Sequence, residues 1–474
     1  MICFYFFGSF LKKFKQRGRT IVKIKNLFYG LIAIALIVIC LVILAAGEHK
    51  EAMNAVAAET ANINNGDTAW MLVSAALVMF MTPGLAFFYG GLVRRKNVLS
   101  VLMQCMFILC LVTVQWILFG YSLSFGPTIK GLIGDLSFAG LIGVGMAPSV
   151  VYATTVPHCL FMIYQAMFAV ITPALIIGAF AERIRFVPFC IFTILWSTVV
   201  YDPMVHWLWA DKGILGAFGG MGALDFAGGI VVHINAGMAS LAAALFLGKR
   251  IGYPDKISPP HNLPFAVLGA GMLWFGWFGF NAGSALSSGG LAANAFVVTH
   301  IAGAVAGLTW GILDLIYNNR STVLGLITGA VAGLAAITPA SGFVTPLGAI
   351  VIGIGAGVIC YMSVTFAKAR FGYDDSLDAF GVHGISGIWG TLAVGIFASK
   401  FVNPAGGEGA LYGSIELLLD QISAIAITMV YSFIVSFVLF WLVDRIFGLR
   451  VTEHSERVGL DLTEHREAAY TTLE

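Results

Sequence analysis

Long apolar stretches separated by short polar connections dominate this chain. After Asn65, eleven apolar stretches follow one another, most of them near the about 20 residues that a helix needs to cross a bilayer. Their approximate limits are 68–93, 98–126, 158–181, 187–208, 226–248, 264–281, 293–316, 322–337, 344–367, 379–399 and 415–444. This pattern predicts an all-α polytopic membrane protein with eleven transmembrane helices.

The basic residues between the spans predict the orientation. Alternate loops hold Arg94, Arg95, Lys96, Arg183, Arg185, Lys249, Arg250, Lys256, Arg320, Lys368 and Arg370. The opposite loops hold only Lys130, Lys212 and Lys400. Because loops rich in Lys and Arg stay on the cytoplasmic side, we expect a multi-pass protein of the cell (inner) membrane, with the mature N-terminus outside and the C-terminus cytoplasmic.

Residues 1–57 have the layout of a secretory signal peptide with its processing region. A basic segment with seven lysines and arginines precedes an apolar run from Leu27 to Ala46, and small residues follow. Cleavage is expected after Ala46 or after the triplet 55–57. A retained signal anchor is the alternative, because the run is just long enough to span a bilayer.

Composition agrees with a membrane protein. Hydrophobic residues make up 59% of the chain and charged residues 11%, against about 25% charged in soluble domains. The 56 glycines suit closely packed transmembrane helices. A net charge of +2 gives no reason to expect nucleic acid as a partner, and the seven cysteines contain no CxxC pair, so neither a disulfide framework nor a zinc site is expected.

The chain also carries signs of an internal repeat. Spans one to five and six to ten have opposite orientations because five is an odd number, which predicts an inverted 5+5 repeat followed by a long eleventh helix. The segments LDFAGGIVVHINAG (224–237) and LDAFGVHGISG (377–387) fall in the last span of each set, and Ile-Thr-Pro at 171–173 recurs at 337–339. Asp225 and Asp378 are the acids that this alignment pairs.

Two histidines inside these segments are the strongest pointer to function. His233 and His383 lie 150 positions apart, each in a stretch that should lie in lipid. An ionisable side chain there costs about 2.5 kcal/mol or more, so it is kept mainly for function or a specific contact. Matching positions in the two halves predict a site near the middle of the membrane.

Three interpretations of the histidines remain open from the residues alone. They could be core side chains satisfied by backbone carbonyls. They could ligate a metal, although a zinc site needs three or four ligands and only Asp225 and Asp378 lie nearby. They could form a proton relay, in which two imidazoles share a hydrogen bond and titrate as one unit.

Aromatic residues cluster in three of the spans. WFGWFGFNAGSA (274–285) ends the sixth span, Tyr164 to Phe186 covers the third, and Trp209 lies near the outer end of the fourth. Aromatic faces attract small cations by about 2 kcal/mol when the cation is desolvated. Most aromatic residues in such a chain serve packing or the membrane interface, so this observation alone singles out no residue.

Several motifs closely resemble the ammonium transporter family (Amt/MEP/Rh), on its bacterial Amt branch. The resemblance runs from about Asp67 to Tyr470. Its most specific pieces are PGLAFFYGGLVRRKNVLS (83–100), GAFAERIRF (178–186), GALDFAGGIVVHINAG (222–237), WFGWFGFNAGSA (274–285), DAFGVHGISGIWG (378–390) and the tail GLRVTEHSERVGLDLTEHREAAY (448–470).

The resemblance implies a homotrimer in which each subunit has its own narrow pore. By motif position, the outer ammonium recruitment site is Trp209, Phe168 and Ser284, and the gate below it is Phe168 and Phe280. The pore histidines are His233 and His383.

The resemblance also implies supporting residues. Asp225 is a buried acid below the recruitment site, Gln165 is its polar neighbour, and Tyr164 keeps an aromatic face. The residues themselves predict that Asp225 caps the start of a helix. His300 matches no motif, and we expect it to make a local polar contact outside the pore.

The domain organisation follows from the same motifs. Residues 58–447 are expected to form the membrane domain and residues 448–474 a cytoplasmic regulatory tail. The tail is polar with no clear helical period, which is typical of a solvated end. The resemblance instead implies that it packs under the trimer and responds to a PII-type regulator.

The expected function is therefore that of an ammonium transporter or channel. It recruits NH4+ at the aromatic outer site and conducts NH3, with or without a separately relayed proton, through a hydrophobic pore; methylammonium should compete, and no cofactor is expected. An ammonium sensor with little or no transport is the alternative, disfavoured because no kinase or cyclase module follows the tail motif. A symporter with unwound helices fits the aromatic mouth poorly, and an enzyme is not expected because there is no nucleophile motif or phosphate loop.

Overall fold

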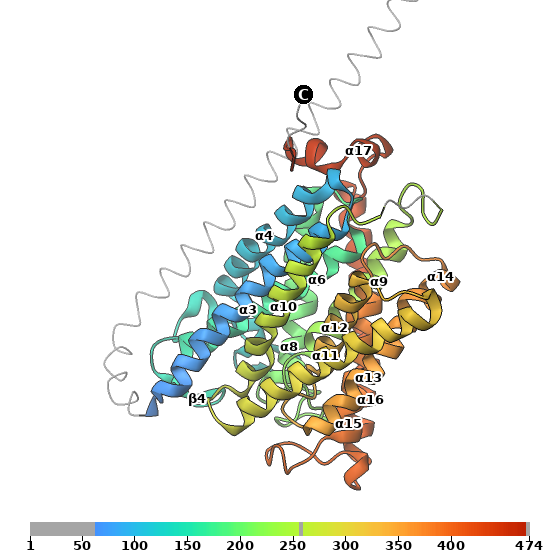
Figure 1. Cartoon of the computed structure of the whole chain (residues 1–474). Coiled ribbons are helices and arrows are strands. Elements are labelled where there is room, and N and C mark those ends of the chain that lie inside the picture. The colour runs from blue at the N-terminus through green and yellow to red at the C-terminus, as the bar shows by residue number, and fades with distance from the viewer. Residues whose placement is uncertain (1–61, 256–258, 471–474) are drawn as a thin grey trace, which may run out of the picture. The chain divides into compact units, whose positions relative to one another are not determined.

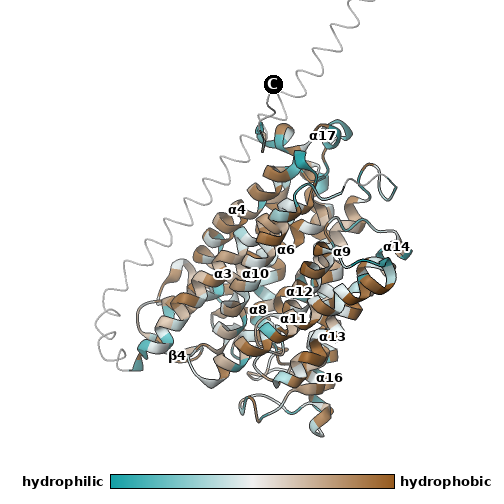
Figure 2. Ribbon diagram, viewed as in Figure 1, coloured by the Kyte–Doolittle hydropathy of each residue, from teal (hydrophilic) through white to brown (hydrophobic). Residues whose placement is uncertain are grey.

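The computed structural model describes residues 62–255 and 259–470. The predicted signal peptide, residues 1–57, lies outside the described residues. Figure 1 shows helices of the membrane domain lying side by side, with the tail helix α17(Glu453–Val458) at one end of the bundle. Figure 2 shows apolar residues along the lengths of these helices and polar residues gathered near α17 and α14(Lys368–Phe371), as expected for a helix bundle in lipid.

The predicted spans are all present as helices. Ten are long and apolar enough to cross a membrane: Asn65–Leu92, Arg95–Phe125, His158–Phe180, Phe186–Trp209, Gly229–Leu247, Leu263–Ala285, Gly290–Asn318, Pro346–Phe371, Phe380–Phe397 and Glu416–Phe447. The eleventh, Val323–Ile337, is shorter. The all-α polytopic fold class is therefore confirmed.

Several spans consist of consecutive helical segments. In chain order the spans contain α3(Asn65–Leu92); η3(Arg95–Asn97), α4(Val98–Gln115), η4(Trp116–Gly120) and α5(Tyr121–Phe125); α6(His158–Phe180); α7(Phe186–Trp196), η6(Ser197–Tyr201) and α8(Asp202–Trp209); η7(Gly229–Ile234) and α9(Asn235–Leu247); α10(Leu263–Ala282) and η8(Gly283–Ala285); α11(Gly290–Asn318); α12(Val323–Ile337); α13(Pro346–Met362), η9(Ser363–Ala367) and α14(Lys368–Phe371); η10(Phe380–Gly384) and α15(Ile385–Phe397); and α16(Glu416–Phe447).

The remaining elements are short. The loop after α5 contains the antiparallel pairs β1(Thr128–Ile129) with β2(Ile133–Gly134) and β3(Pro148–Ser149) with β4(Ala153–Pro157), together with η5(Ala139–Leu141). The turn η11(Ala410–Tyr412) precedes α16, and η12(Asp461–His465) follows α17.

Local sequence explains where many of these helices begin. Asn64 accepts hydrogen bonds from the backbone N–H groups of Gly66 and Asp67 at the start of α3. Thr345 caps α13 in the same way, and proline follows it at the first helical position. Such caps satisfy N–H groups that have no partner within the helix.

The helices pack in the reciprocal pattern that an inverted repeat predicts. Helix α3 packs on α10, α6 on α9 and α12 on α15, and each half's last span contacts the other's, α9 against η10 and α15 against η7. Gly237 of α9 and Gly384 of η10 meet at this crossing, where a Cβ on Gly237 would lie 2.2 Å from the Gly384 Cα. Only glycine permits so close an approach of two backbones.

The tail is ordered against the bundle, so the prediction of a solvated end from its composition is wrong. The Arg183 carbonyl accepts from Val451 N–H (3.0 Å), and Arg185 N–H donates to the Leu449 carbonyl (2.9 Å). Asp461 caps the start of α4 by accepting from Ser100 N–H (2.8 Å). These contacts, two between backbone groups and one from the Asp461 side chain, hold residues 449–461 against the membrane domain.

Candidate functional site

The two predicted histidines lie next to each other in the bundle, with nearly parallel rings. Their ring centroids lie 5.3 Å apart with the planes inclined by 9°, and the residues are 1% and 4% exposed. Each lies in a π-helical turn, His233 in η7 and His383 in η10. Because a π-helical turn carries an extra residue within a helix, it re-aims these side chains relative to the α-helices that follow.

The hydrogen bond that the relay interpretation assumed is not formed. Within the part of the chain that the structure describes, neither ring nitrogen of His233 has a hydrogen-bond partner, and neither does Nδ1 of His383. The two ring planes are nearly parallel, at 9°, without a hydrogen bond between them. The buried nitrogens also lack backbone carbonyl partners, which leaves the core interpretation without its main contact.

The described residues do not provide the ligands that the metal interpretation requires. Among residues 62–255 and 259–470, no group of three or more His, Cys, Asp or Glu side chains is gathered so that it could hold a metal ion. Asp225, one of the two acids considered, has its oxygens engaged by the backbone. Asp378, the other, accepts from Lys368 Nζ at 2.7 Å.

Asp225 caps the π-helical turn that carries His233. Its Oδ1 accepts from the N–H groups of Gly228 (2.9 Å) and Gly229 (2.6 Å), and its Oδ2 accepts from those of Ile230 (2.8 Å) and Val231 (3.0 Å). The turn requires Gly228 at φ +112°, a conformation that glycine adopts without strain. A carboxylate that accepts four backbone N–H groups fixes the start of η7 and with it His233.

The acid that matches Asp225 in the second half is Asp375, so the alignment of Asp225 with Asp378 is wrong. Asp375 accepts from the N–H groups of Ala379 (3.1 Å) and Phe380 (2.8 Å) at the start of η10. It precedes His383 by eight positions, as Asp225 precedes His233. The Leu-Asp pair drew attention to the wrong acid because Asp378 repeats the local dipeptide but not the spacing to the histidine.

Aromatic rings continue from the histidines toward the end of α8. The Phe168 and Phe280 rings lie 4.3 Å apart at 33°, and the Trp209 ring lies 5.8 Å from Phe168 at 88°. Phe280 in turn lies 6.2 Å from the His233 ring. The structure thus brings Trp209, Phe168, Phe280 and the histidines into one column.

Tyr164 and Ser284 lie beside this column. Tyr164 Oη lies 3.0 Å from the carbonyls of Gly279 and Phe280 and 3.2 Å from Ser284 Oγ. Ser284 Oγ donates to the Phe280 carbonyl at 2.9 Å, and Trp209 Nε1 donates to the Asp225 carbonyl at 2.8 Å. These bonds fix the Phe280 backbone and the Trp209 ring.

Two of the remaining residues do not make the contacts expected of residues in the site. All four hydrogen bonds of the Asp225 carboxylate go to backbone groups, so the structure does not make Gln165 its partner. His300 is exposed on the subunit surface, with its ring 5.5 Å from Trp274. It lines none of the cavities around the histidines.

Sequence reasoning missed Trp277 as part of the site. Its ring stacks on His233 with centroids 5.6 Å apart and planes inclined by 22°, and its Nε1 donates to Thr338 Oγ1 at 2.9 Å. The WFGWFGFNAGSA motif contained the residue, and its spacing of three from Phe280 could have placed both on one helix face.

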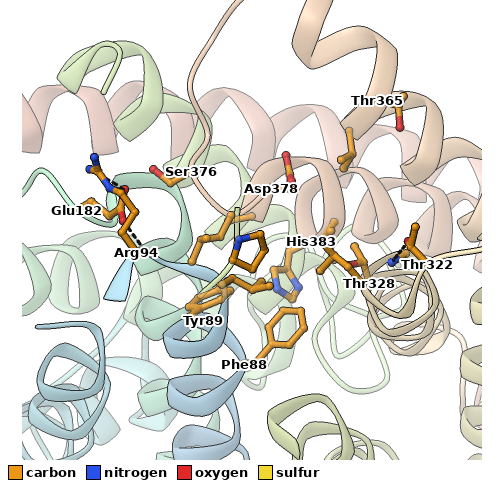
Figure 3. Close-up of a pocket in the computed structure, with 18 of the residues that line it drawn as sticks. Phe88, Tyr89, Arg94, Glu182, Thr322, Thr328, Thr365, Ser376, Asp378 and His383 are labelled. Carbon is orange, nitrogen blue, oxygen red and sulfur yellow. Dashed lines mark hydrogen bonds and ion pairs between the residues drawn. The ribbon is translucent and has the colours of Figure 1, made fainter. Parts of the chain in front are cut away.

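Cavities lie on both sides of the histidine pair. A small one is lined by apolar side chains, by Phe280 and by both histidines, and it leaves about 10 Å³ for the centre of a water-sized molecule, which is about one small molecule. A wider one of about 320 Å³ extends from His383 past Tyr89 to Arg94 and Glu182 (Figure 3). We call this wider cavity the inner vestibule.

The rim of the inner vestibule is a buried network of ion pairs. Glu182 pairs with Arg94 (2.9 Å) and Arg250 (3.2 Å), and Asp374 pairs with Arg183 (2.8 Å) and Arg250 (2.9 Å). Burial acts to raise the pKa of both carboxyls, but these guanidinium groups hold the pKa of Glu182 and of Asp374 below their usual values. Both acids are therefore ionised at neutral pH.

Comparison with known proteins places this architecture in a family. The sequence matches the model of the Ammonium Transporter Family over residues 69–470. It is 51% identical over 405 residues to an ammonium transporter of Bacillus subtilis, covering 85% of this chain and 98% of the relative. It is 47% identical over 409 residues to ammonium transporter Amt1 of Archaeoglobus fulgidus, covering 86% and 100%.

Solved structures agree with the sequence match. The crystal structure of Saccharomyces cerevisiae Mep2 superposes with a TM-score of 0.78 at 36% identity, covering 83% of this chain and 89% of that one. A structure described as a Sensor Amt Protein gives a TM-score of 0.76 at 30% identity, covering 85% and 98%. The relatives are named transporters and not enzymes. With the matched span running from α3 to Tyr470, the chain belongs to the Ammonium Transporter Family.

Proposed function

We propose that this protein recruits NH4+ at Trp209, Phe168 and Ser284 and conducts NH3 past His233 and His383 to the inner vestibule. The observation that carries the proposal is the single column of rings from Trp209 through Phe168 and Phe280 to the histidine pair. The column ends in a cavity of about 320 Å³. A neutral molecule of one heavy atom fits the narrow part of this route.

The outer residues suit a small cation better than a neutral solute. Ring faces of Trp209 and Phe168 and the hydroxyl of half-buried Ser284 lie at one end of the column. Cation–π contacts contribute about 2 kcal/mol each when desolvated. They concentrate NH4+, and methylammonium should compete with it because it presents the same ammonium group.

The apolar middle of the column does not suit a cation. Stripping a small ion of water and placing it in low dielectric costs of order 20 kcal/mol in the idealised limit. A few aromatic contacts do not offset that cost, so the molecule that passes Phe280 is NH3. The proton either stays on the outer side or follows separately along the histidines.

The unpartnered imidazole nitrogens support a role for the histidines in this passage. Three of their four nitrogens are buried without a partner among the described residues, and a buried polar atom without a partner costs about 1–3 kcal/mol. Ammonia, which donates and accepts hydrogen bonds, would satisfy these nitrogens as it passes.

Ammonium pulses on proteoliposomes adsorbed to a supported membrane test the proposal. The wild-type protein should transport ammonium, and methylammonium should compete. An electrical current that accompanies this transport would show that the proton crosses as well. His383→Glu supplies a carboxylate that holds a cation, and we expect it to convert the pore to passive ion leak. Wild-type currents in His383→Glu and in both alanine variants of the histidines contradict the histidine role.

A sensor is the second candidate, because one structure similar to this chain is described as a Sensor Amt Protein. A sensor would bind ammonium with little or no flux. The same reconstituted protein distinguishes the two: saturable ammonium binding without transport favours sensing.

The proposal extends to assembly and regulation. We propose a homotrimer in the cell (inner) membrane with the tail on the cytoplasmic side and a PII-type regulator binding there. The unequal distribution of Lys and Arg between the loops supports this orientation. The orientation can be tested in intact cells by adding a cysteine to the loop after α5, which should then react with a thiol reagent that does not cross the membrane.

A further inference from the structure

We infer that the tail side of the protein carries a separate binding site for a phosphate group. The site is a cavity of about 760 Å³ between three segments far apart in sequence: Arg94–Lys96, Pro259–His261 and 461–470 of the tail. Its volume is in the range of ligand pockets. It lies beyond the start of α4 and is distinct from the inner vestibule, with which it shares Arg94 and Pro260.

Two positive charges on its wall have no carboxylate partner. Among the described residues, Arg95 and Lys96 form no ion pair, whereas Arg94 pairs with Glu182 and Arg457 with Glu453. Lys96 Nζ donates instead to the carbonyl of Arg457 in the tail. An unmatched pair of adjacent cations is the feature expected of a site for an anion.

An aromatic ring holds one of these cations in place. The Arg95 guanidinium lies 5.1 Å from the centroid of the Tyr470 ring. Tyr470 Oη is 3.0 Å from His261 Nε2, and His261 Nδ1 is 2.9 Å from the Val93 carbonyl. A guanidinium held over a ring keeps its planar set of donors fixed, which is the geometry that suits phosphate oxygens.

The acids that line the cavity leave its positive charge in excess. The Asp461 carboxylate is turned to the backbone of α4, where Oδ1 accepts from Ser100 N–H. Glu467 is exposed. The helix start at Val98 offsets the charge of Asp461, so Glu467 is the one acid in the described lining left to oppose Arg95 and Lys96.

Two sources could supply the phosphate: a soluble nucleotide and the headgroup of an anionic lipid. Both would place phosphate oxygens against Arg95 and Lys96. They differ in what else fills the cavity, because a nucleotide base can stack on Tyr470 whereas lipid chains must reach the adjacent bilayer.

Binding to the purified full chain tests the site without measuring transport, so it stays separate from the proposed function. ATP is titrated in detergent, and phosphatidylglycerol retention is counted by native mass spectrometry. Arg95→Gln/Lys96→Gln should weaken binding of the active probe about tenfold or more, since hydrogen bonds to charged groups contribute at least that much. Arg445→Gln/Arg457→Gln is the control, because it removes the same charge from residues outside the cavity.

A second variant separates binding from folding. Tyr470→Leu keeps both cations but removes the ring, and it should weaken binding several-fold while the elution volume and unfolding temperature stay unchanged. ATP binding that only the cavity variants weaken identifies a soluble ligand, and selective loss of phosphatidylglycerol identifies a lipid. The inference is overturned if neither probe binds, or if both double variants lose binding equally.

Discussion

At the scale of single residues, the histidine pair is the least replaceable part of the site. His233 and His383 are adjacent, buried and held by turns that Asp225 and Asp375 cap. Nothing in this arrangement stabilises the bundle through hydrogen bonds of the rings. Under the proposed function, the two imidazoles are kept there for contact with the molecule that passes them.

We expect His233→Ala and His383→Ala each to lower ammonium flux at least tenfold, because the passing molecule loses one of its two polar contacts among apolar side chains. Stopped-flow measurement of proteoliposomes checks the flux. The unfolding temperature of both variants should stay near that of the wild type, and His300→Ala is the control because its ring lines none of these cavities. Unchanged flux in both variants would show that the histidines are core residues.

Trp209→Ala should weaken the apparent affinity for ammonium more than the maximal rate. Its ring contributes one cation–π contact at the outer end of the column, about 1–2 kcal/mol or roughly a five- to thirtyfold change. Concentration dependence of transport measures both quantities. Trp207→Ala is the matched control, since Trp207 belongs to the same helix but packs on Tyr431.

Most of the site residues could be predicted because they occur in recognisable motifs. His233, His383, Phe168, Phe280, Trp209 and Ser284 all lie at or beside the column. The geometry of the histidine rings could not be predicted, because it depends on π-helical turns that leave no periodic pattern. The correspondence between Asp225 and Asp375 was missed. Both acids precede a histidine by eight positions, but the Leu-Asp dipeptide of Asp225 recurs at Asp378.

At the scale of elements, the crossing of α9 and η10 determines where the histidines sit. The two segments touch through backbone atoms at Gly237 and Gly384. The span limits were predictable from the apolar pattern within a few residues. The crossing was not, since glycines are scattered through every span and only the fold shows which of them meet.

Gly237→Ala should therefore separate the two segments and displace both histidines. A Cβ there would lie 2.2 Å from the Gly384 Cα, and the backbone must move. We expect a loss of about 1–3 kcal/mol of stability, as in overpacked cores, and a clear loss of flux. Gly271→Ala in α10 is the control, because its Cβ would meet no atom within 4 Å; equal effects in both variants contradict this account.

At the scale of the whole molecule, the tail connects the first half of the repeat with the loop that precedes α10. It pairs with the 183–185 loop of the first half, and Glu456 accepts from Ile251 N–H (2.6 Å) and from Arg450 (3.0 Å). Ile251 lines the inner vestibule. The tail thus supports the loop that forms part of the wall of the inner vestibule.

Truncation after Phe447 should lower transport several-fold without preventing membrane insertion, because the loop at Ile251 loses these contacts. Flux per inserted protein, quantified after reconstitution, is the measurement. A nucleotide-dependent complex with a trimeric PII protein of the same cell should also be lost. Full transport by the truncated protein would show that the tail packs on the bundle without affecting transport.

The ion pairs around Glu182 and Asp374 predict how stability depends on acid. Because the pKa of each carboxyl is lower in the folded protein, the unfolded chain binds protons first as the pH falls. Their contribution is complete above pH about 5 and is lost as the pH falls through about 4 and below. Unfolding temperatures between pH 3 and 6 check this, and Asp374→Asn should reduce the fall in unfolding temperature at acid pH.

The pairing of Arg183 with Asp374 also constrains the order in which the chain can mature. Arg183 is fully buried, and its partner follows 191 residues later. A ribosome that has delivered only the first five spans has therefore delivered a cation whose counter-charge does not yet exist, and a buried charge without its partner costs about 3–5 kcal/mol. The first half must wait, open at the end that holds Arg183, until the ninth span has emerged. Expressed alone, it should be degraded; expressed with the second half as a separate chain, it should be rescued.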